Sequence, residues 1–347
     1  MKKLLSISSV AGLLFAATAA AYGAEGTLFV TASNATANQL LVYDSTATLI
    51  QTVATGGKGG VSGNSGGIAA EGDAVAVVNF GSKTVSIFQR AIGGFKLKQT
   101  IPTSSSPVSV AIGNGHLYTL GTTTVESHLW QSWFGNVSVN ASSDGLAGLV
   151  LADGSAAQVG VVTNGLVITE KTGVIETVGV SGTGAVSGAA TLVSNIPSNP
   201  MAPFGLVTRG NNAYVTIAHS DEISLVRNGT VLATTPTSSF AGPTQHAPCW
   251  VTLEGPYLFS SNSPSHSISL WAVYGQNIVP DVGVAATLNG APTDIAVKHW
   301  QLVVIDGAGS ASHLSIFSVD EDGNLTIQGS ATMGSGANGV AIIEPLS

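Results

Sequence analysis

The chain has 347 residues, with 11 Lys or Arg and 19 Asp or Glu, which gives a formal net charge of −8. No basic run interrupts this acidic balance, which argues against nucleic acid as a partner. Only 9% of the residues are charged, against about 25% in typical soluble domains. Ser, Thr, Asn and Gly must therefore keep most of the surface hydrated, a composition common in exported proteins. The single cysteine, Cys249, excludes an intramolecular disulfide.

Residues 1–23 have the pattern of a secretory signal peptide. Lys2 and Lys3 precede the apolar run "LLSISSVAGLLFAATAAA", and small residues follow as far as Gly23. The sequence thus predicts an exported protein, extracellular or, in a bacterium, periplasmic. No second apolar run of this kind follows, so we expect no membrane span.

Seven apolar segments with one strand-like pattern follow along the chain. The fourth residue of each core recurs at spacings of 47, 41, 50, 47, 45 and 44. These seven residues are Ala32, Asn79, Leu120, Glu170, Ile217, Asn262 and Asp306. Seven copies at a period of about 46 residues indicate a repeat architecture.

Each copy is preceded by a short apolar run and, in most repeats, followed by two further strand-like runs. Four short strands per repeat, joined by Gly, Asn, Asp and Ser turns, describe a propeller blade. The sequence therefore predicts an all-β, seven-bladed β-propeller over residues 24–347. The final "NGVAIIEP" repeats the inner-strand pattern, and the first copy has no room for an inner strand of its own. We expect the C-terminal strand to close the ring in the first blade.

The stretches "YVTI", "FSSN" and "TDIAVKHWQLVVID" resemble the seven-bladed lactonase-type propellers. That family includes the propeller-type 6-phosphogluconolactonase and the 3-carboxy-cis,cis-muconate lactonizing enzyme. The resemblance covers essentially the whole mature chain. It implies a site at the mouth of the central channel, where a lactonase needs an acid/base and a cationic clamp.

Four motif positions of that family differ in this chain. Where the family has a Pro-His motif in blade four, this chain has Gln158, and Phe204 replaces a basic pair in blade five. Ala218 and His219 stand where the family has Asn-Glu, and Asn262 is present without the Arg that follows it in the family. The expectation is that the family's catalytic set is missing. "GNSGG" around Ser65 formally matches GxSxG, but it leads into a strand and such matches are common in a chain with 43 glycines.

Polar residues that end or open strands at the predicted channel mouth are the candidate ligand-binding residues. They are Asn79, Glu170, Lys171, His219, His246, Asn262, His266, Asp294 and Asp306. Glu170 is the one catalytic candidate, and its alternative interpretation is a polar residue at the end of a strand. The three histidines with Asp294 are the only plausible metal ligands in this set, but they have no HxH or HExxH spacing, so we predict no metal site. No other cofactor is expected.

The leading hypothesis is a non-catalytic extracellular binding protein, a monomer, with an unknown small molecule or carbohydrate on the channel-mouth face. One alternative is a lactonase or cycloisomerase with a rearranged site. Another is a surface glycoprotein or antigen, for which sequons at Asn34, Asn136, Asn140, Asn228 and Asn324 are available.

Overall fold

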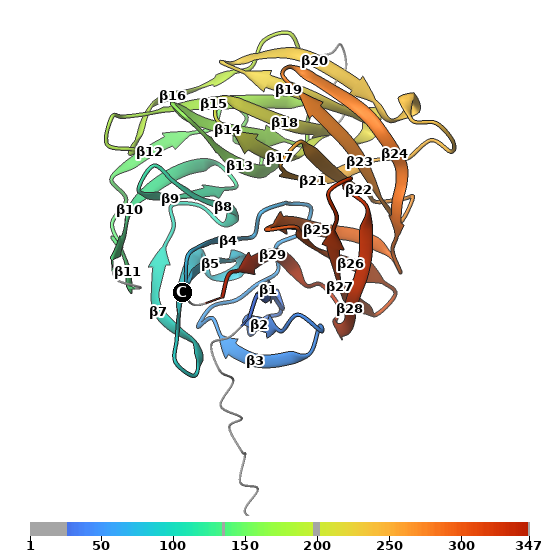
Figure 1. Ribbon diagram of the computed structural model, residues 1–347. Coiled ribbons are helices and arrows are strands. Elements are labelled where there is room, and N and C mark those ends of the chain that lie inside the picture. The colour runs from blue at the N-terminus through green and yellow to red at the C-terminus, as the bar shows by residue number, and fades with distance from the viewer. Residues whose placement is uncertain (1–25, 134–135, 197–201, 346–347) are drawn as a thin grey trace, which may run out of the picture.

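The computed structural model describes residues 26–133, 136–196 and 202–345. The predicted signal peptide, residues 1–23, lies outside these residues. The described chain forms seven sheets, each built from strands that are neighbours in sequence, apart from one sheet that combines the two ends of the chain. Figure 1 shows the sheets arranged as blades around a common centre. The predicted seven-bladed β-propeller is confirmed.

The strands of the first three blades are Leu28–Ala32 (β1), Gln39–Tyr43 (β2), Leu49–Ala54 (β3), Ile68–Glu71 (β4), Ala74–Asn79 (β5), Thr84–Ala91 (β6), Gly94–Pro102 (β7), Pro107–Gly113 (β8), His116–Gly121 (β9), Thr124–Trp133 (β10), Asn136–Val139 (β11) and Gly145–Gly148 (β12). The next two blades contain Ala156–Val162 (β13), Gly165–Glu170 (β14), Val174–Val180 (β15), Val186–Leu192 (β16), Pro203–Arg209 (β17), Asn212–Ile217 (β18), Glu222–Arg227 (β19) and Thr230–Pro236 (β20). The last strands are Pro248–Glu254 (β21), Tyr257–Asn262 (β22), Ser267–Tyr274 (β23), Asn277–Thr287 (β24), Ala291–Lys298 (β25), Gln301–Ala308 (β26), Ala311–Val319 (β27), Leu325–Gly334 (β28) and Asn338–Ile343 (β29). Three short 3-10 helices are Phe80–Ser82 (η1), Ala218–Ser220 (η2) and Thr237–Ser239 (η3).

Tight turns between strands explain why the blades form where the sequence predicted them. Asn114 and Gly115 join β8 to β9, and both have positive φ, 50° and 71°. Asn228 and Gly229 join β19 to β20 with the same pair of values. Two-residue turns of this kind match the twist of antiparallel strands, and Asn-Gly is their preferred sequence.

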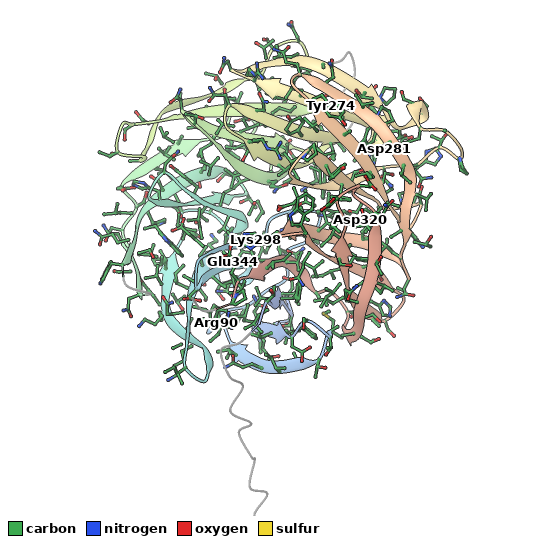
Figure 2. All side chains as sticks on the ribbon, in the orientation of Figure 1. Arg90, Tyr274, Asp281, Lys298, Asp320 and Glu344 are labelled. Atoms are coloured by element: carbon green, nitrogen blue, oxygen red, sulfur yellow. The ribbon has the colours of Figure 1, made fainter. Side chains whose placement is uncertain are left out.

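The ring is closed as predicted. β29 pairs antiparallel with β1, with Ala341 opposite Val30, so the C-terminus supplies the inner strand of blade one. Just after β29, the Glu344 carboxylate is 2.6 Å from Lys298 Nζ of blade seven. Arg90 of blade two donates to the Glu344 carbonyl oxygen, also at 2.6 Å (Figure 2). These contacts tie blades seven, one and two together at the seam of the ring.

The core lies between neighbouring blades. Val30 and Val42 of blade one pack in one buried cluster with Val75 and Phe88 of blade two. Each fully buried side chain of this size contributes about 1.5–3 kcal/mol to folding. Among the described residues, the search for a helix long and apolar enough to cross a bilayer found none.

Candidate functional site at the channel mouth

One end of the blades carries the residues predicted for the site. In each blade, the loop between the second and third strands and the connection into the next inner strand lie at the same end. We call this end the channel-mouth face. Glu170 is the last residue of β14, Lys171 follows it, and Asp294 lies near the start of β25.

Asn79 and Asn262 end the second strands of blades two and six, and both side chains are fully buried. The Asn79 amide donates to Thr84 Oγ1 and Ser86 Oγ at 3.2 and 2.8 Å. Its oxygen accepts from Asn38 Nδ2 at 3.0 Å and from Thr55 Oγ1 at 2.7 Å. Thr55 belongs to the connection that enters blade two, so Asn79 joins its blade to that connection.

Asn262 repeats this arrangement in blade six. Its amide donates to Ser267 Oγ and Ser269 Oγ at 3.0 and 2.8 Å, the same two positions along the third strand. Ser267 in turn donates to Gln245 Oε1, in the connection entering blade six, at 2.5 Å. Asn79 and Asn262 therefore contribute internal hydrogen bonds, and the expectation that they face a ligand cavity is wrong.

Asp306 occupies the equivalent position in blade seven. It is fully buried, and its Oδ1 is 2.9 Å from His313 Nδ1 on the third strand. Its Oδ2 has no hydrogen-bond partner among the described residues. Asp306 too is turned into its blade and away from solvent, contrary to the prediction.

Glu170 is likewise fully buried. Ser155 Oγ, in the connection entering blade four, donates to Glu170 Oε2 at 2.7 Å, whereas Oε1 has no partner among the described residues. Burial raises the pKa of this carboxyl to about 7. This burial fits the alternative interpretation of Glu170, a polar residue at the end of a strand, because its side chain points into the connection entering its own blade. A phase difference of one residue decides this, since successive side chains of a strand face opposite sides.

The centre of the channel holds a segment of the chain itself, residues 61–67, which we call the channel loop. It precedes β4, and Figure 1 shows this blue segment reaching into the middle of the ring. Lys171 Nζ donates to the Gly63 carbonyl at 2.6 Å, and Trp250 Nε1 donates to the Asn64 carbonyl at 3.1 Å. The Ser65 N–H donates to the Ala157 carbonyl at 3.1 Å. Blades four and six thus hold the loop from two sides.

The loop is also bonded to blades one, three and seven. The amides of Asn64 and Asn338 donate to each other, at 3.1 and 2.9 Å. Ser109 Oγ donates to the Gly66 carbonyl at 3.2 Å, and the Gly66 N–H donates to Asp294 Oδ2 at 3.3 Å. The channel loop is therefore held by side chains or backbone of five blades.

Gly66 is required by this packing. Its φ of +65° is one that other residues rarely adopt, and a Cβ there would lie 2.9 Å from Ser109 Oγ and 3.2 Å from Gln158 Nε2. Gln158 is further fixed by its Oε1, which accepts from the Leu206 N–H at 2.6 Å. The position where the family has a Pro-His motif is thus occupied here by a residue packed against the loop.

Asp294 lies beneath the channel loop and is 4% exposed. Burial raises its pKa to about 7, although hydrogen bonds from the Ile295, Gly66 and Val340 N–H groups and from Ser65 act in the opposite direction. The prediction placed Asp294 on an open rim. The structure buries it because the loop covers it.

The predicted residues that do reach solvent are the three histidines of blades five and six. His219 on η2 and His266 in the β22–β23 loop are exposed. His246 is exposed as well, and its Nδ1 is 2.8 Å from Asp221 Oδ2. Asp221 Oδ1 also accepts from the Ala247 N–H at 2.6 Å. Within the described residues, no group of three or more His, Cys, Asp or Glu is placed to hold a metal ion.

The Lys171 ammonium and the Cys249 thiol are not free to react with a ligand at the channel mouth. The Lys171 ammonium also donates to the Ala156 carbonyl, at 3.2 Å, and burial lowers its pKa. Cys249 is half-buried, and burial raises the pKa of its thiol to about 12. A thiol with so high a pKa is almost wholly protonated at neutral pH and is a poor nucleophile.

Sequence reasoning did not single out the channel loop or Asp221. The glycine-rich "GGKGGVSGNSGG" is a usable signal for the loop, because residues 55–67 form the longest connection between two blades. For Asp221 the signal is weaker, since it depends on the short η2 turn after β18.

The fold and site define a seven-bladed β-propeller of the lactonase-like type with a filled channel. Solved structures with the same fold include proteins provisionally named as 6-phosphogluconolactonases from Bacteroides uniformis and Bacteroides fragilis. The first is 15% identical, with a TM-score of 0.63 and coverage of 91% of this chain and 99% of that one. The second is 14% identical, with a TM-score of 0.64 and coverage of 93% and 99%.

A protein from Lactobacillus plantarum is similar to the same degree, at 16% identity, a TM-score of 0.62 and coverage of 92% and 99%. No protein-family model and no curated protein matches the chain. Likeness at these identities establishes the fold, whereas the chemistry has to be judged from the site.

Proposed function

We propose that this chain is a secreted, non-catalytic binding protein that takes its ligand on the channel-mouth face. The channel loop is the observation that carries the proposal. It fills the channel at the place where the resemblance to lactonases would put an active site, and side chains of blades one, three, four, six and seven are bonded to it.

The groups that lactone chemistry would need are all engaged within the protein. Glu170 and Asp294 are buried, and the Lys171 ammonium is bonded to the carbonyls of Gly63 and Ala156. A cation held by two carbonyls inside the protein is a poor clamp for an anionic substrate. An acid/base that no substrate can reach gives no rate enhancement.

The accessible polar groups on this face suit ligand binding. His219, His246 and His266 are exposed on neighbouring blades, and Asp221 fixes the orientation of the His246 ring. Imidazole rings offer hydrogen bonds and flat surfaces to a small polar molecule. Export by residues 1–23 would place this face in contact with extracellular solutes.

The test combines turnover with binding. Purified mature protein should hydrolyse glucono-1,5-lactone and other small lactones no faster than buffer. In a thermal-shift panel of sugars, sugar acids and lactones, a ligand that raises the melting temperature should lose its effect in His246→Ala and His219→Ala. His299→Ala is the matched control, because His299 is an exposed histidine at the β25–β26 turn, on the opposite face. Retention of the full shift in both rim variants would contradict the proposal.

A second candidate, an enzyme whose channel loop opens, is favoured by one observation. Glu170 and Asp294 both have a pKa of about 7, and carboxyls with raised pKa values are common in acid/base catalysis. Lactone hydrolysis above the buffer rate that disappears in Asp294→Asn would support this candidate and overturn the first.

A further inference from the structure

The face opposite the channel mouth carries two adjoining hollows. The smaller, about 200 Å³, lies between blades four and five, and the larger, about 560 Å³, lies at the turns of blades three and four. Asn164, in the β13–β14 turn, lines both. The two hollows therefore meet at Asn164, and we call them together the asparagine groove.

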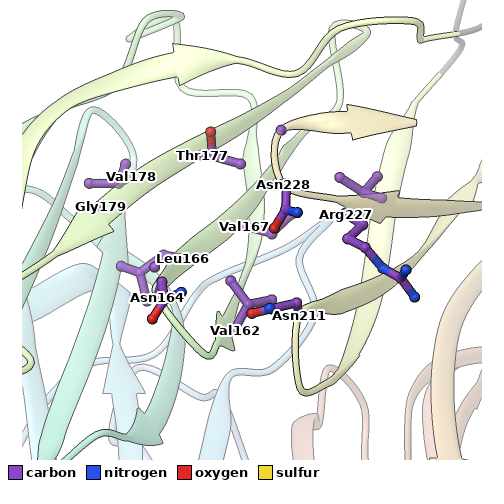
Figure 3. A pocket seen from close by; sticks show the side chains of 13 residues that line it. Val162, Asn164, Leu166, Val167, Thr177, Val178, Gly179, Asn211, Arg227 and Asn228 are labelled. Atoms are coloured by element: carbon purple, nitrogen blue, oxygen red, sulfur yellow. The ribbon is translucent and has the colours of Figure 1, made fainter. Parts of the chain in front are cut away.

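Three turns form the rim of the smaller hollow. Asn164, Asn211 and Asn228 come from the β13–β14, β17–β18 and β19–β20 turns, and all three are exposed. Figure 3 shows their side chains around one hollow. The floor is aliphatic and buried, and it consists of Leu166, Val167, Val178 and Val226.

The larger hollow continues the polar lining toward blade three. Asn114 lies at the β8–β9 turn, and Ser181 and Thr183 lie in the β15–β16 turn. The rest of its wall is Thr163, Val180 and small residues. The groove is thus polar along its length and has an aliphatic floor at one end.

Charge decides what class of ligand this groove suits. Among the described residues, no carboxylate lines either hollow and Arg227 is the only charged residue in their linings. Arg227 Nε donates to Asn212 Oδ1 at 2.6 Å, and in Figure 3 its guanidinium points away from Asn164. The linings thus contain one positive charge at one edge, which disfavours a cation, while the chain's net charge of −8 disfavours an anion, so an uncharged ligand suits the groove best.

Hydrogen-bond chemistry and size narrow the class further. A primary amide both donates and accepts, as do the hydroxyls of Ser and Thr, so the rim can pair with the many hydroxyls of a sugar. At roughly 30 Å³ per water, the smaller hollow holds about seven waters, close to the space of one pyranose ring. The floor residues are covered, so the C–H face of that ring would pack against the partly exposed side chains of Val162 and Thr177.

We propose that the asparagine groove binds a neutral oligosaccharide. One ring sits against the partly exposed Val162 and Thr177, and the chain extends past Asn164 toward Ser181. The site is separate from the histidine rim, so it stands or falls independently of the proposed function.

Binding of three neutral trisaccharides, maltotriose, cellotriose and mannotriose, to the mature protein tests this proposal. Saturation-transfer NMR and calorimetry at up to about 10 mM sugar detect millimolar dissociation constants. At least one trisaccharide should bind, and Asn164→Ala and Asn211→Ala should each weaken it by about fivefold, the loss expected for one or two hydrogen bonds. Neither amide has a hydrogen bond within the described residues that its removal would break, so the melting temperature should stay unchanged.

Two controls make the outcome decisive. Asn277→Ala removes an exposed asparagine from the start of β24, at the same face but outside the groove, and should leave binding unchanged. Trigalacturonate, of similar length but negatively charged, should bind more weakly than the neutral sugar. Failure of all three neutral sugars to bind, equal binding by Asn164→Ala, or equal binding of trigalacturonate would each overturn the proposal.

Discussion

The second strands of blades two and six end in an asparagine, whereas those of blades four and seven end in a carboxylic acid or carry one at the equivalent position. All four side chains are fully buried. Asn79 makes four hydrogen bonds, two as donor and two as acceptor. Glu170 and Asp306 each leave one carboxylate oxygen without a partner among the described residues.

The difference follows from what each group offers. An amide supplies donors and an acceptor together, so it can meet both the hydroxyls of the third strand and the groups of the entering connection. An ionised carboxylate only accepts, and its burial without full pairing is unfavourable. That cost appears at Glu170 as a pKa raised to about 7. At this position of the repeat, Asn79 therefore stabilises blade two, whereas the incompletely paired carboxyl of Glu170 destabilises blade four when it is ionised.

Removal of the blade-two amide should have the largest effect. Asn79→Ala removes all four hydrogen bonds of a fully buried side chain, although Asn38 Nδ2 and Thr55 Oγ1 keep the Val78 and Asn38 carbonyls as second acceptors, both at 3.1 Å. We expect a loss of about 3 kcal/mol in the free energy of unfolding, since each lost hydrogen bond contributes about 0.5–1.5 kcal/mol. Denaturant titration measures it, with the exposed Asn277→Ala as the control. A loss below about 1 kcal/mol would contradict the stabilising role.

Replacing the Asn262 amide of blade six by a carboxyl should create there the same unfavourable burial of a carboxylate that Glu170 has in blade four. In Asn262→Asp the new carboxylate would face Ser267 and Ser269, whose hydroxyls already donate to Gln245 Oε1 and the Gly283 carbonyl. The Ser260 hydroxyl donates to the side-chain oxygen of residue 262 only at 3.4 Å, and this long hydrogen bond does not offset burial of the charge. The folded-state pKa of the introduced carboxyl should therefore rise above its unfolded value. Stability should therefore fall as pH increases through that pKa, by about 2 kcal/mol between pH 4 and pH 8 relative to the unmodified chain.

Unfolding curves at a series of pH values check this second expectation. Asn277→Asp, at the exposed start of β24, should show no such dependence. If Asn262→Asp has the same pH profile as the unmodified chain, the amide and carboxyl positions are equivalent and the comparison fails.

The fold could be read from the sequence because its signals are local. Alternating apolar residues and Gly- or Asn-containing turns recur along the blades, and the unpaired pattern in "NGVAIIEP" identified the closing strand. The positions of Asn79, Glu170, Asn262 and Asp306 at or near strand ends were predicted correctly for the same reason.

The site could not be read in the same way. Whether a strand-end side chain faces the channel or the blade interior depends on a phase of one residue. Irregularities of register, such as the one between Pro292 and Asp294, shift that phase at the start of the inner strands. The contact of Gly66 with Asp294 joins residues far apart in sequence, and no local pattern encodes it.

The smallest effect is expected from Glu170→Gln, which removes the charge from the strained position. Glu170 has a folded-state pKa raised from 4.5 to about 7. Below about pH 4 the group is protonated in both the folded and unfolded chain, so its stabilising contribution is fully present. As pH rises from 4.5 toward 7, the unfolded chain loses the proton first, and stability falls until it levels off above pH 7.

Glutamine cannot ionise, so the variant should lack this fall. A pKa shift of this size corresponds to a loss of at most about 3 kcal/mol in the free energy of unfolding of the unmodified chain at high pH. In the variant, a buried amide atom without a hydrogen-bond partner lowers the free energy of unfolding by about 2 kcal/mol at every pH. We therefore expect Glu170→Gln to be less stable than the unmodified chain at pH 5, to match it near pH 6, and to be more stable by about 1 kcal/mol at pH 8. Some slope should remain, because Asp294 titrates in the same range. Glu321→Gln, at an exposed loop, is the control and should change nothing. A variant less stable than the unmodified chain at pH 8 would mean that the Glu170 carboxylate is a favourable partner for Ser155, and that blade four is not strained.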